Sequence, residues 1–179
     1  EFHAASGTWS ELRCYPMPGG GLATLWKDVT AAQRAEESRH YLARASEILA
    51  ASLDRDETAR QLAFLLVPRL ADWTSVQLLD EQGVLRQVAV AHVDPAKVAW
   101  ARELNERYPP DPEQPHGAHE VVRTGKPVLF AEIPEALLVA AAQDAEHLRI
   151  MREIGFTSAL TVPLAARGRT LGVMTLVSA

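Results

Sequence analysis

The chain has 179 residues, 47% hydrophobic and 23% charged, a composition that suits one ordinary soluble domain with an appendage. Its net charge of -5 comes from 18 basic and 23 acidic residues spread through the sequence. The sequence therefore has no basic stripe of the kind that binds nucleic acid or a membrane surface, and neither partner is favoured. No apolar run reaches the roughly 18 residues typical of a membrane span, and no secretory leader opens the chain, so we expect a cytoplasmic protein.

Cysteine chemistry is limited because the chain has a single cysteine, Cys14. One thiol excludes an internal disulfide and a zinc site built from thiolates, and it fits a reducing compartment. We interpret Cys14 as an ordinary strand residue.

The first predicted element is a β-hairpin that leads into a helix. Residues 8–15 alternate aromatic and polar side chains like a strand, Pro and Gly cluster at 16–21, and residues 22–26 predict the returning strand. Asp28 or Thr30 can cap the helix that follows. Two strands cannot bury a core of their own, so the hairpin either leans on the rest of the chain, leans on a second copy, or is disordered.

Two helices are expected before the main sheet. The first, residues 31–53, carries apolar residues at helical spacing, namely Leu42, Ala45, Ile48 and Leu49. The second is predicted by Asp54 and Glu57, which stand three apart as in a capping box. We expect Pro68 to bend its last turns. Its inward residues are expected to be Leu62, Leu65, Leu66 and Leu70.

Residues 74–80 and 84–92 are β-rich runs that predict an antiparallel pair, with Gly83 in the short loop between them. The second run separates larger side chains from small ones, with Val88, Val90 and His92 on one face and Ala89 and Ala91 on the other. The small residues allow a helix to lie close, so we expect the sheet to be covered on both sides.

A helix start is predicted by Asp94 and Pro95, because Asp caps the first turn and Pro tolerates the first helical position. This helix extends to residue 107 and gives way to a proline-dense loop at 108–115, which is long enough to act as a flap. Short helical turns then end at Gly125.

The last third of the chain predicts a strand at 127–130, a helix at 134–154 stopped by Gly155, and a hairpin of strands 158–164 and 170–177. The inward residues of the helix are expected to be Leu137, Leu138, Leu148 and Met151. This order of elements predicts an α+β domain on an antiparallel sheet.

Several motifs resemble a GAF domain. They are the runs 121–128 and 155–164, then Gly168 and the run 171–173. The likeness covers residues 40–179 and is greatest to GAF domains of bacterial multi-domain sensor proteins, of the histidine kinase or serine phosphatase type. It implies a GAF-like antiparallel sheet with helices on both faces, here without the family's closing helix.

The start of the chain resembles another family. The triplet at 28–30 is similar to the Asp-Ile-Thr that ends the last strand of a PAS sensor domain. The two resemblances together imply a PAS remnant at 1–30, a helical signalling linker at 31–39 and a GAF domain at 40–179.

We expect no catalysis and therefore name no catalytic residues. The sequence has no phosphate-binding loop and no recognisable pair of nucleophile and base. GAF relatives that reduce methionine sulfoxide or attach a bilin use cysteines within the domain, and residues 40–179 have none. The Asn-Lys-Phe-Asp-Glu signature of cyclic-nucleotide binders is also missing.

Histidines leave two alternatives open. His116 and His119 are spaced to share a helix face, and His92 or Asp111 could complete a metal site, but no third ligand has a diagnostic spacing. The same histidines could serve as an axial ligand of haem. We predict no metal site, and we interpret His40 as a linker residue because the pattern around a phosphorylated histidine is absent.

The first functional hypothesis is a ligand-sensing module in which a small molecule binds between the sheet and the helix at 95–107. The candidate lining residues are Gln77, His92, Trp100 and Tyr108. Trp100 and Tyr108 could instead cover the core. The identity of any ligand or cofactor is left open.

The alternative is a ligand-free relay. The helix at 31–53 would pair with its copy in a homodimer and pass a conformational change to an output domain.

Overall fold

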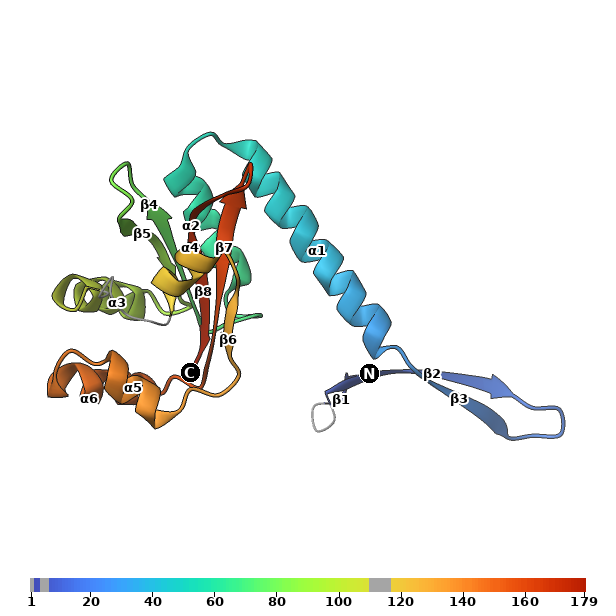
Figure 1. Ribbon diagram of the computed structural model, residues 1–179. Helices are drawn as coiled ribbons and strands as arrows, with labels where there is room; N and C mark the ends of the chain where they lie inside the picture. Colours follow the sequence, from blue (N-terminus) through green and yellow to red (C-terminus); the bar gives the residue numbers. More distant parts are fainter. Residues whose placement is uncertain (1, 4–6, 110–116) are drawn as a thin grey trace. The chain divides into compact units, whose positions relative to one another are not determined.

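Figure 1 shows the computed structural model, which describes residues 2–3, 7–109 and 117–179. The chain divides into two compact units, residues 1–47 and 48–179. Among the described residues, no helix combines the length and apolar character needed to cross a membrane. Most of the predicted flap lies outside the described residues.

The first unit contains a three-stranded antiparallel sheet in the order β1-β2-β3. Its strands are β1 (Phe2–His3), β2 (Thr8–Pro16) and β3 (Leu22–Asp28). The predicted hairpin is confirmed, since β2 and β3 pair from Ser10 opposite Asp28 to Pro16 opposite Leu22. The short strand β1 was not predicted.

The long helix α1 (Thr30–Ala51) follows β3 closely. The Asp28 Oδ1 accepts a hydrogen bond from the backbone N of Thr30 at 2.8 Å. The Thr30 Oγ1 accepts one from the backbone N of Trp9 at 2.8 Å. Asp28 therefore accepts from the first amide of α1 as predicted, whereas the Thr30 side chain binds the backbone of β2 and not a helix amide. Within the described part of the chain, α1 has no buried residue.

The second unit is built on a five-stranded antiparallel sheet in the order β5-β4-β8-β7-β6. Its strands are β4 (Trp73–Leu79), β5 (Leu85–Ala91), β6 (Val128–Phe130), β7 (Ser158–Ala166) and β8 (Arg169–Ser178). The predicted hairpins β4–β5 and β7–β8 are both present. The fold is the expected α+β fold.

The pairing of β4 with β8 joins the beginning of this sheet to its end. It runs from Trp73 opposite Val177 to Leu78 opposite Gly172. A Cβ added at Gly172 would lie only 2.1 Å from the backbone O of Gln77. Glycine is therefore required where the two strands approach each other.

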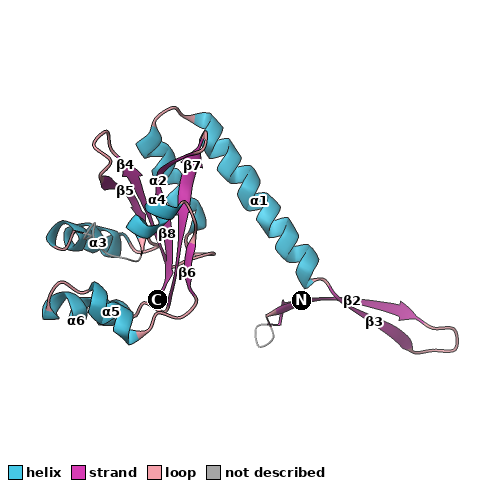
Figure 2. Cartoon of the chain, viewed as in Figure 1, coloured by secondary structure: helices cyan, strands magenta, loops and turns pink. Residues whose placement is uncertain are grey.

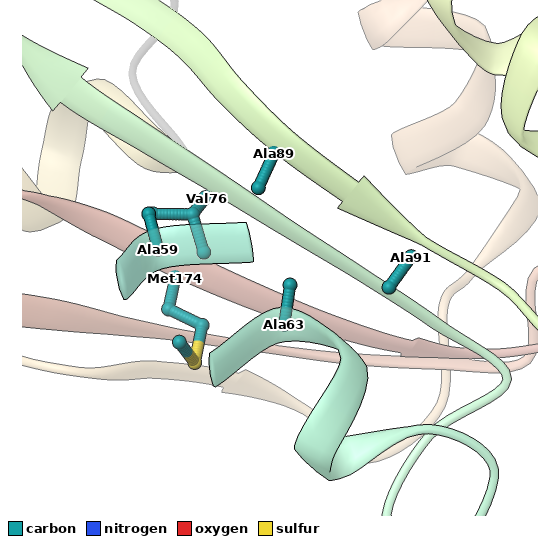
Figure 3. Packing of buried hydrophobic residues seen from close by; sticks show 6 residues of the cluster. All are labelled: Ala59, Ala63, Val76, Ala89, Ala91 and Met174. Carbon is teal, nitrogen blue, oxygen red and sulfur yellow. The ribbon is translucent and has the colours of Figure 1, made fainter. Parts of the chain in front are cut away.

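One face of the sheet packs against α2 (Arg55–Leu66), as Figure 3 shows. The helix contributes Ala59 and Ala63, which are buried against Ala89 and Ala91 of β5. Val76 and Met174 complete the cluster. The small residues predicted to admit a helix do so, because alanine side chains let the backbones approach closely.

The ends of α2 differ in part from the prediction. The Asp54 Oδ1 accepts from the backbone N of Glu57 at 3.1 Å, but the Glu57 carboxylate binds Arg60 and Gln61 instead of completing a capping box. The helix ends at Leu66, before Pro68, so Pro68 does not bend it. The residue before a proline disfavours helical angles, and Val67 is extended. Leu70 was expected inward but is 53% exposed.

The opposite face of the sheet is covered by the remaining helices. They are α3 (Pro95–Arg107), α4 (Ala118–Thr124), α5 (Glu135–Ala141) and α6 (Ala145–Ile154). Figure 2 shows α3, α5 and α6 on one side of the sheet. Asp94 caps α3 as predicted, accepting from the backbone N of Ala96 at 2.9 Å. Gly125 and Gly155 end α4 and α6 in the left-handed conformation.

The helix predicted at 134–154 is interrupted. The α5 helix ends at Ala141, and α6 begins after Asp144, whose Oδ1 accepts from the backbone N of His147 at 2.7 Å. An aspartate that satisfies a free amide favours a new helix start over continuation. Leu138 is buried as expected, and so is Ile150, which was not predicted.

Candidate functional site

A cavity of about 360 Å³ lies against the sheet face opposite α2. The strands contribute Trp73 and Ser75 from β4, Val90 from β5 and Thr175 from β8. Side chains alternate along a strand, so Ser75 faces the cavity while its neighbour Val76 lies in the α2 core.

Helices form the other walls of the cavity. Trp100 and Leu104 come from α3, Tyr108 from its C-terminal cap, and Met151 and Ile154 from α6. The lining is mostly apolar, and its polar members among the described residues are uncharged side chains or histidines. These polar residues are Thr74, Ser75, Gln87, Asn105, Tyr108, His119, Gln143, His147 and Thr175.

A cluster centred on Tyr108 joins α3 to α6 at this cavity. The Tyr108 hydroxyl donates to Asp144 and lies 3.2 Å from each carboxylate oxygen. Its ring stacks on that of His147, with centroids 4.2 Å apart and planes 8° from parallel. The Arg107 guanidinium lies 5.1 Å from the centre of the Tyr108 ring. Two helices distant in sequence are therefore linked through one side chain.

The charges in this cluster are set by hydrogen bonding and burial. The His147 backbone N–H, together with the Tyr108 hydroxyl, holds the pKa of Asp144 below its ordinary value. Burial raises the pKa of Tyr108, so the phenol keeps its proton and is the donor.

Burial also keeps the His147 ring neutral at physiological pH. Burial lowers its pKa, and the nearby Asp144 only partly opposes this. The His147 Nδ1 accepts a hydrogen bond from the backbone N of Gln143 at 3.2 Å. The proton of the neutral ring therefore sits on Nε2.

An open groove of about 670 Å³ adjoins the cavity, and the two share Gln87, Val90, Asn105 and His119. The groove carries charge, from Arg60, Arg86, Arg102 and Glu106. Charged side chains thus gather outside the apolar cavity.

Comparison with known proteins identifies the fold. The family model described as GAF domain matches residues 54–179. The chain belongs to the GAF domain family. GAF domains are typically small-molecule-binding regulatory modules of signalling proteins and are usually non-catalytic, although some are enzymes.

Solved GAF domains share the architecture at low sequence identity. The GAF domain of an Acinetobacter phosphoenolpyruvate-protein phosphotransferase is 16% identical with a TM-score of 0.56, over 80% of this chain and 77% of that one. The GAF domain of a phosphoenolpyruvate-protein phosphotransferase from Coxiella burnetii is 17% identical with a TM-score of 0.53, over 78% of this chain and 76% of that one. The A. aeolicus nlh2 GAF domain is 14% identical with a TM-score of 0.53, over 78% and 77%. Among curated proteins, none matches the chain.

The four residues predicted to line a GAF ligand site fall in different places. Trp100 and Tyr108 line the cavity together. Gln77 lines the adjoining groove. His92 is absent from the described lining of both and is 8% exposed. It lies against Trp73, with ring centroids 4.4 Å apart, and its Nδ1 accepts from the backbone N of Asp94 at 2.9 Å.

The sequence left open a metal site or a haem ligand built on the histidines of this domain. Among the described residues, no three His, Cys, Asp or Glu side chains are grouped to hold a metal ion. His116 and Asp111 lie outside the described residues. His119, at the start of α4, lines both the cavity and the groove.

Sequence reasoning missed His147, Gln143 and Asn105. A local signal for the first two existed, because Asp144 can cap a helix whose first turn then contains His147. The stacking of His147 on Tyr108 had no such signal, since the two residues meet only when α6 packs beside the end of α3.

Proposed function

We propose that this chain is a non-catalytic sensory module that binds a small molecule and relays its presence to an output domain. The observation that carries the proposal is the cavity of about 360 Å³, which has a mostly apolar surface and includes the polar lining residues named above. Natural ligand sites have this composition and volume.

The Tyr108 cluster suggests how occupancy could become a signal. It ties the end of α3 to the start of α6 beside the cavity. A ligand that favours one arrangement of these helices shifts the population of the domain by the difference in its affinity for the two arrangements. The proposed signal is therefore a change in the contact between Tyr108 and Asp144.

We propose that residues 1–30 are the end of a PAS domain, 31–39 a signalling linker and 40–179 the GAF domain. The hairpin that leads into α1 supports this assignment. The proposed setting is a cytoplasmic bacterial sensor protein with histidine kinase or serine phosphatase output. No contact with nucleic acid or membrane is part of the proposal.

A ligand-free relay is the second candidate, and α1 favours it. Leu42 and Leu49 on this helix are 68% and 60% exposed. Pairing with the same helix of a second copy would cover them, as in a coiled coil. The proposed homodimer forms through residues 31–53.

Native mass spectrometry of the purified chain tests the sensory proposal. We expect a discrete non-covalent adduct that is released on unfolding. Ala101→Trp, which places a large ring on the cavity wall, should abolish the adduct, whereas Ala99→Trp on the exposed face of α3 should retain it. A clean dimer without adduct would favour the relay, and a clean monomer without adduct would count against both candidates.

A further inference from the structure

Formal charge is absent from the described lining of the cavity, which contains no Asp, Glu, Lys or Arg. An ion that entered this cavity would lose its hydration without meeting a charged side chain among the described lining residues, which is unfavourable. The nearby Arg107 and Asp144 are both engaged with Tyr108. His147 supplies no compensating charge, since burial lowers its pKa. The lining therefore selects against anions and zwitterions.

Aromatic rings make up much of the wall. Trp73 of β4, Trp100 and Tyr108 of α3 and its C-terminal cap, and Phe156 after α6 all line the cavity. Aromatic side chains favour a second ring packed offset or edge-on. Met151 adds a polarizable thioether, which also contacts aromatic rings favourably. A flat, ring-bearing molecule matches these walls better than a branched aliphatic one.

A row of hydroxyl groups crosses the sheet at the cavity floor. Ser75 of β4 stands opposite Thr175 of β8, which stands opposite Thr161 of β7. The Thr161 and Thr175 Oγ1 atoms lie 3.1 Å apart, and either can be the donor. Hydroxyl groups both donate and accept, so Ser75 and Thr175 can bind a neutral polar substituent of either kind.

The volume limits the size of the occupant. A cavity of about 360 Å³ lies near the lower end of the range of natural ligand pockets, roughly 300–1,000 Å³. Charged residues such as Arg86 and Arg102 lie in the adjoining groove rather than in the cavity. Arg86 is already paired with Asp80 at 2.6 Å.

We infer that the ligand is an uncharged aromatic molecule of one or two rings, with a neutral polar substituent seated on the hydroxyl pair of Ser75 and Thr175. This inference rests on the proposed sensory function. It names the chemistry of the ligand at that site and excludes inorganic anions, free amino acids and nucleotides.

Two probes that share one ring system test the inference. 2-Naphthol is neutral at pH 7, and 2-naphthoate carries a carboxylate on the same rings. We expect 2-naphthol to bind the whole chain and 2-naphthoate to bind about 10-fold or more weakly, because the described lining offers its charge no partner. Isothermal titration calorimetry measures both affinities.

Matched variants locate the binding. Thr175→Val removes a hydroxyl at nearly constant shape and should weaken 2-naphthol about 3- to 10-fold, the effect of one neutral hydrogen bond. Thr170→Val, on the same strand but outside the cavity lining, should leave the affinity unchanged. Ala101→Trp should abolish binding. Circular dichroism checks that each variant is folded.

The outcomes separate the inference from the function on which it rests. Equal or tighter binding of 2-naphthoate overturns the inference of an uncharged ligand while leaving a sensory role in place. Binding of 2-naphthol that Ala101→Trp does not affect overturns the assignment to this cavity. If neither probe binds, the aromatic inference fails, and the adduct experiment then decides whether the sensory function fails with it.

Discussion

Replacing Gly172 with alanine perturbs the contact between β4 and β8, on which the cavity floor depends. The added Cβ would lie 2.1 Å from the backbone O of Gln77 and 2.8 Å from the Cα of Leu78. Both atoms belong to the backbone, so no side-chain rotation relieves the overlap. Real Cβ atoms essentially never approach closer than 3.0 Å, so the strands would have to separate by about 1 Å.

The cost follows from this separation. Overpacking in a well-packed interior destabilises by about 1–3 kcal/mol, and a forced backbone shift lies at or above the upper end of that range. We therefore expect the free energy of unfolding to fall by about 3 kcal/mol or more. Since about 1 kcal/mol shifts the melting temperature of a chain of this size by about 2–4 °C, the expected decrease is at least about 6 °C.

Thermal unfolding followed by circular dichroism measures this decrease. Gly168→Ala is the matched control, because its Cβ would meet no atom within 4 Å. Gly168 has a positive φ of 74°, so alanine there costs only the left-handed penalty of about 1–2 kcal/mol. If Gly172→Ala melts within about 2 °C of the unmodified chain, or no lower than Gly168→Ala, the steric reasoning is refuted.

Three further predictions concern other parts of the chain. Ala63→Leu should lower the free energy of unfolding by about 1–3 kcal/mol in urea titrations, because Ala63 is fully buried between α2 and the sheet; an unchanged midpoint would contradict this packing. Asp144, whose pKa is lowered by the His147 amide, should stabilise the fold above its unfolded pKa of about 3.9, and this contribution should be lost as the pH falls through the lower folded value. As the pH is lowered from 6 to 2, the free energy of unfolding should therefore fall less steeply in Asp144→Asn than in the unmodified chain. Equal slopes of the free energy of unfolding against pH would exclude the contribution. Replacing both Leu42 and Leu49 with Glu should convert the proposed dimer to a monomer in sedimentation velocity, and a dimer that persists would place the interface elsewhere.

Most element positions could be read from the sequence because their signals are local. Asp94 followed by Pro95 starts α3, and Gly155 ends α6, since each acts on amides or angles of its immediate neighbours. The alternation of small and large residues in β5 correctly indicated which face receives α2. These features depend on a few adjacent residues and little on the rest of the fold.

The errors arose where a local pattern allowed two structures. The segment 134–154 has helical periodicity throughout, yet Asp144 satisfies free amides better as a cap than inside a helix. The α2 helix stops before Pro68 instead of bending there, because the preceding residue is already extended. Ligand binding by the four candidate residues stays a prediction; Trp100 and Tyr108 line the cavity, whereas His92 lies against Trp73.

The sequence by itself determined most of the order of helices and strands, several of their caps and the family resemblance, because backbone angles and apolar periodicity are properties of neighbouring residues. Only the tertiary structure decided which distant residues meet. The β4–β8 pairing sets Ser75 opposite Thr175, a hundred residues later in the chain, and the packing of α6 beside α3 stacks His147 on Tyr108. Such contacts depend on strand register and helix packing across the whole domain, and these in turn determine the cavity and the uncharged side chains of its described lining.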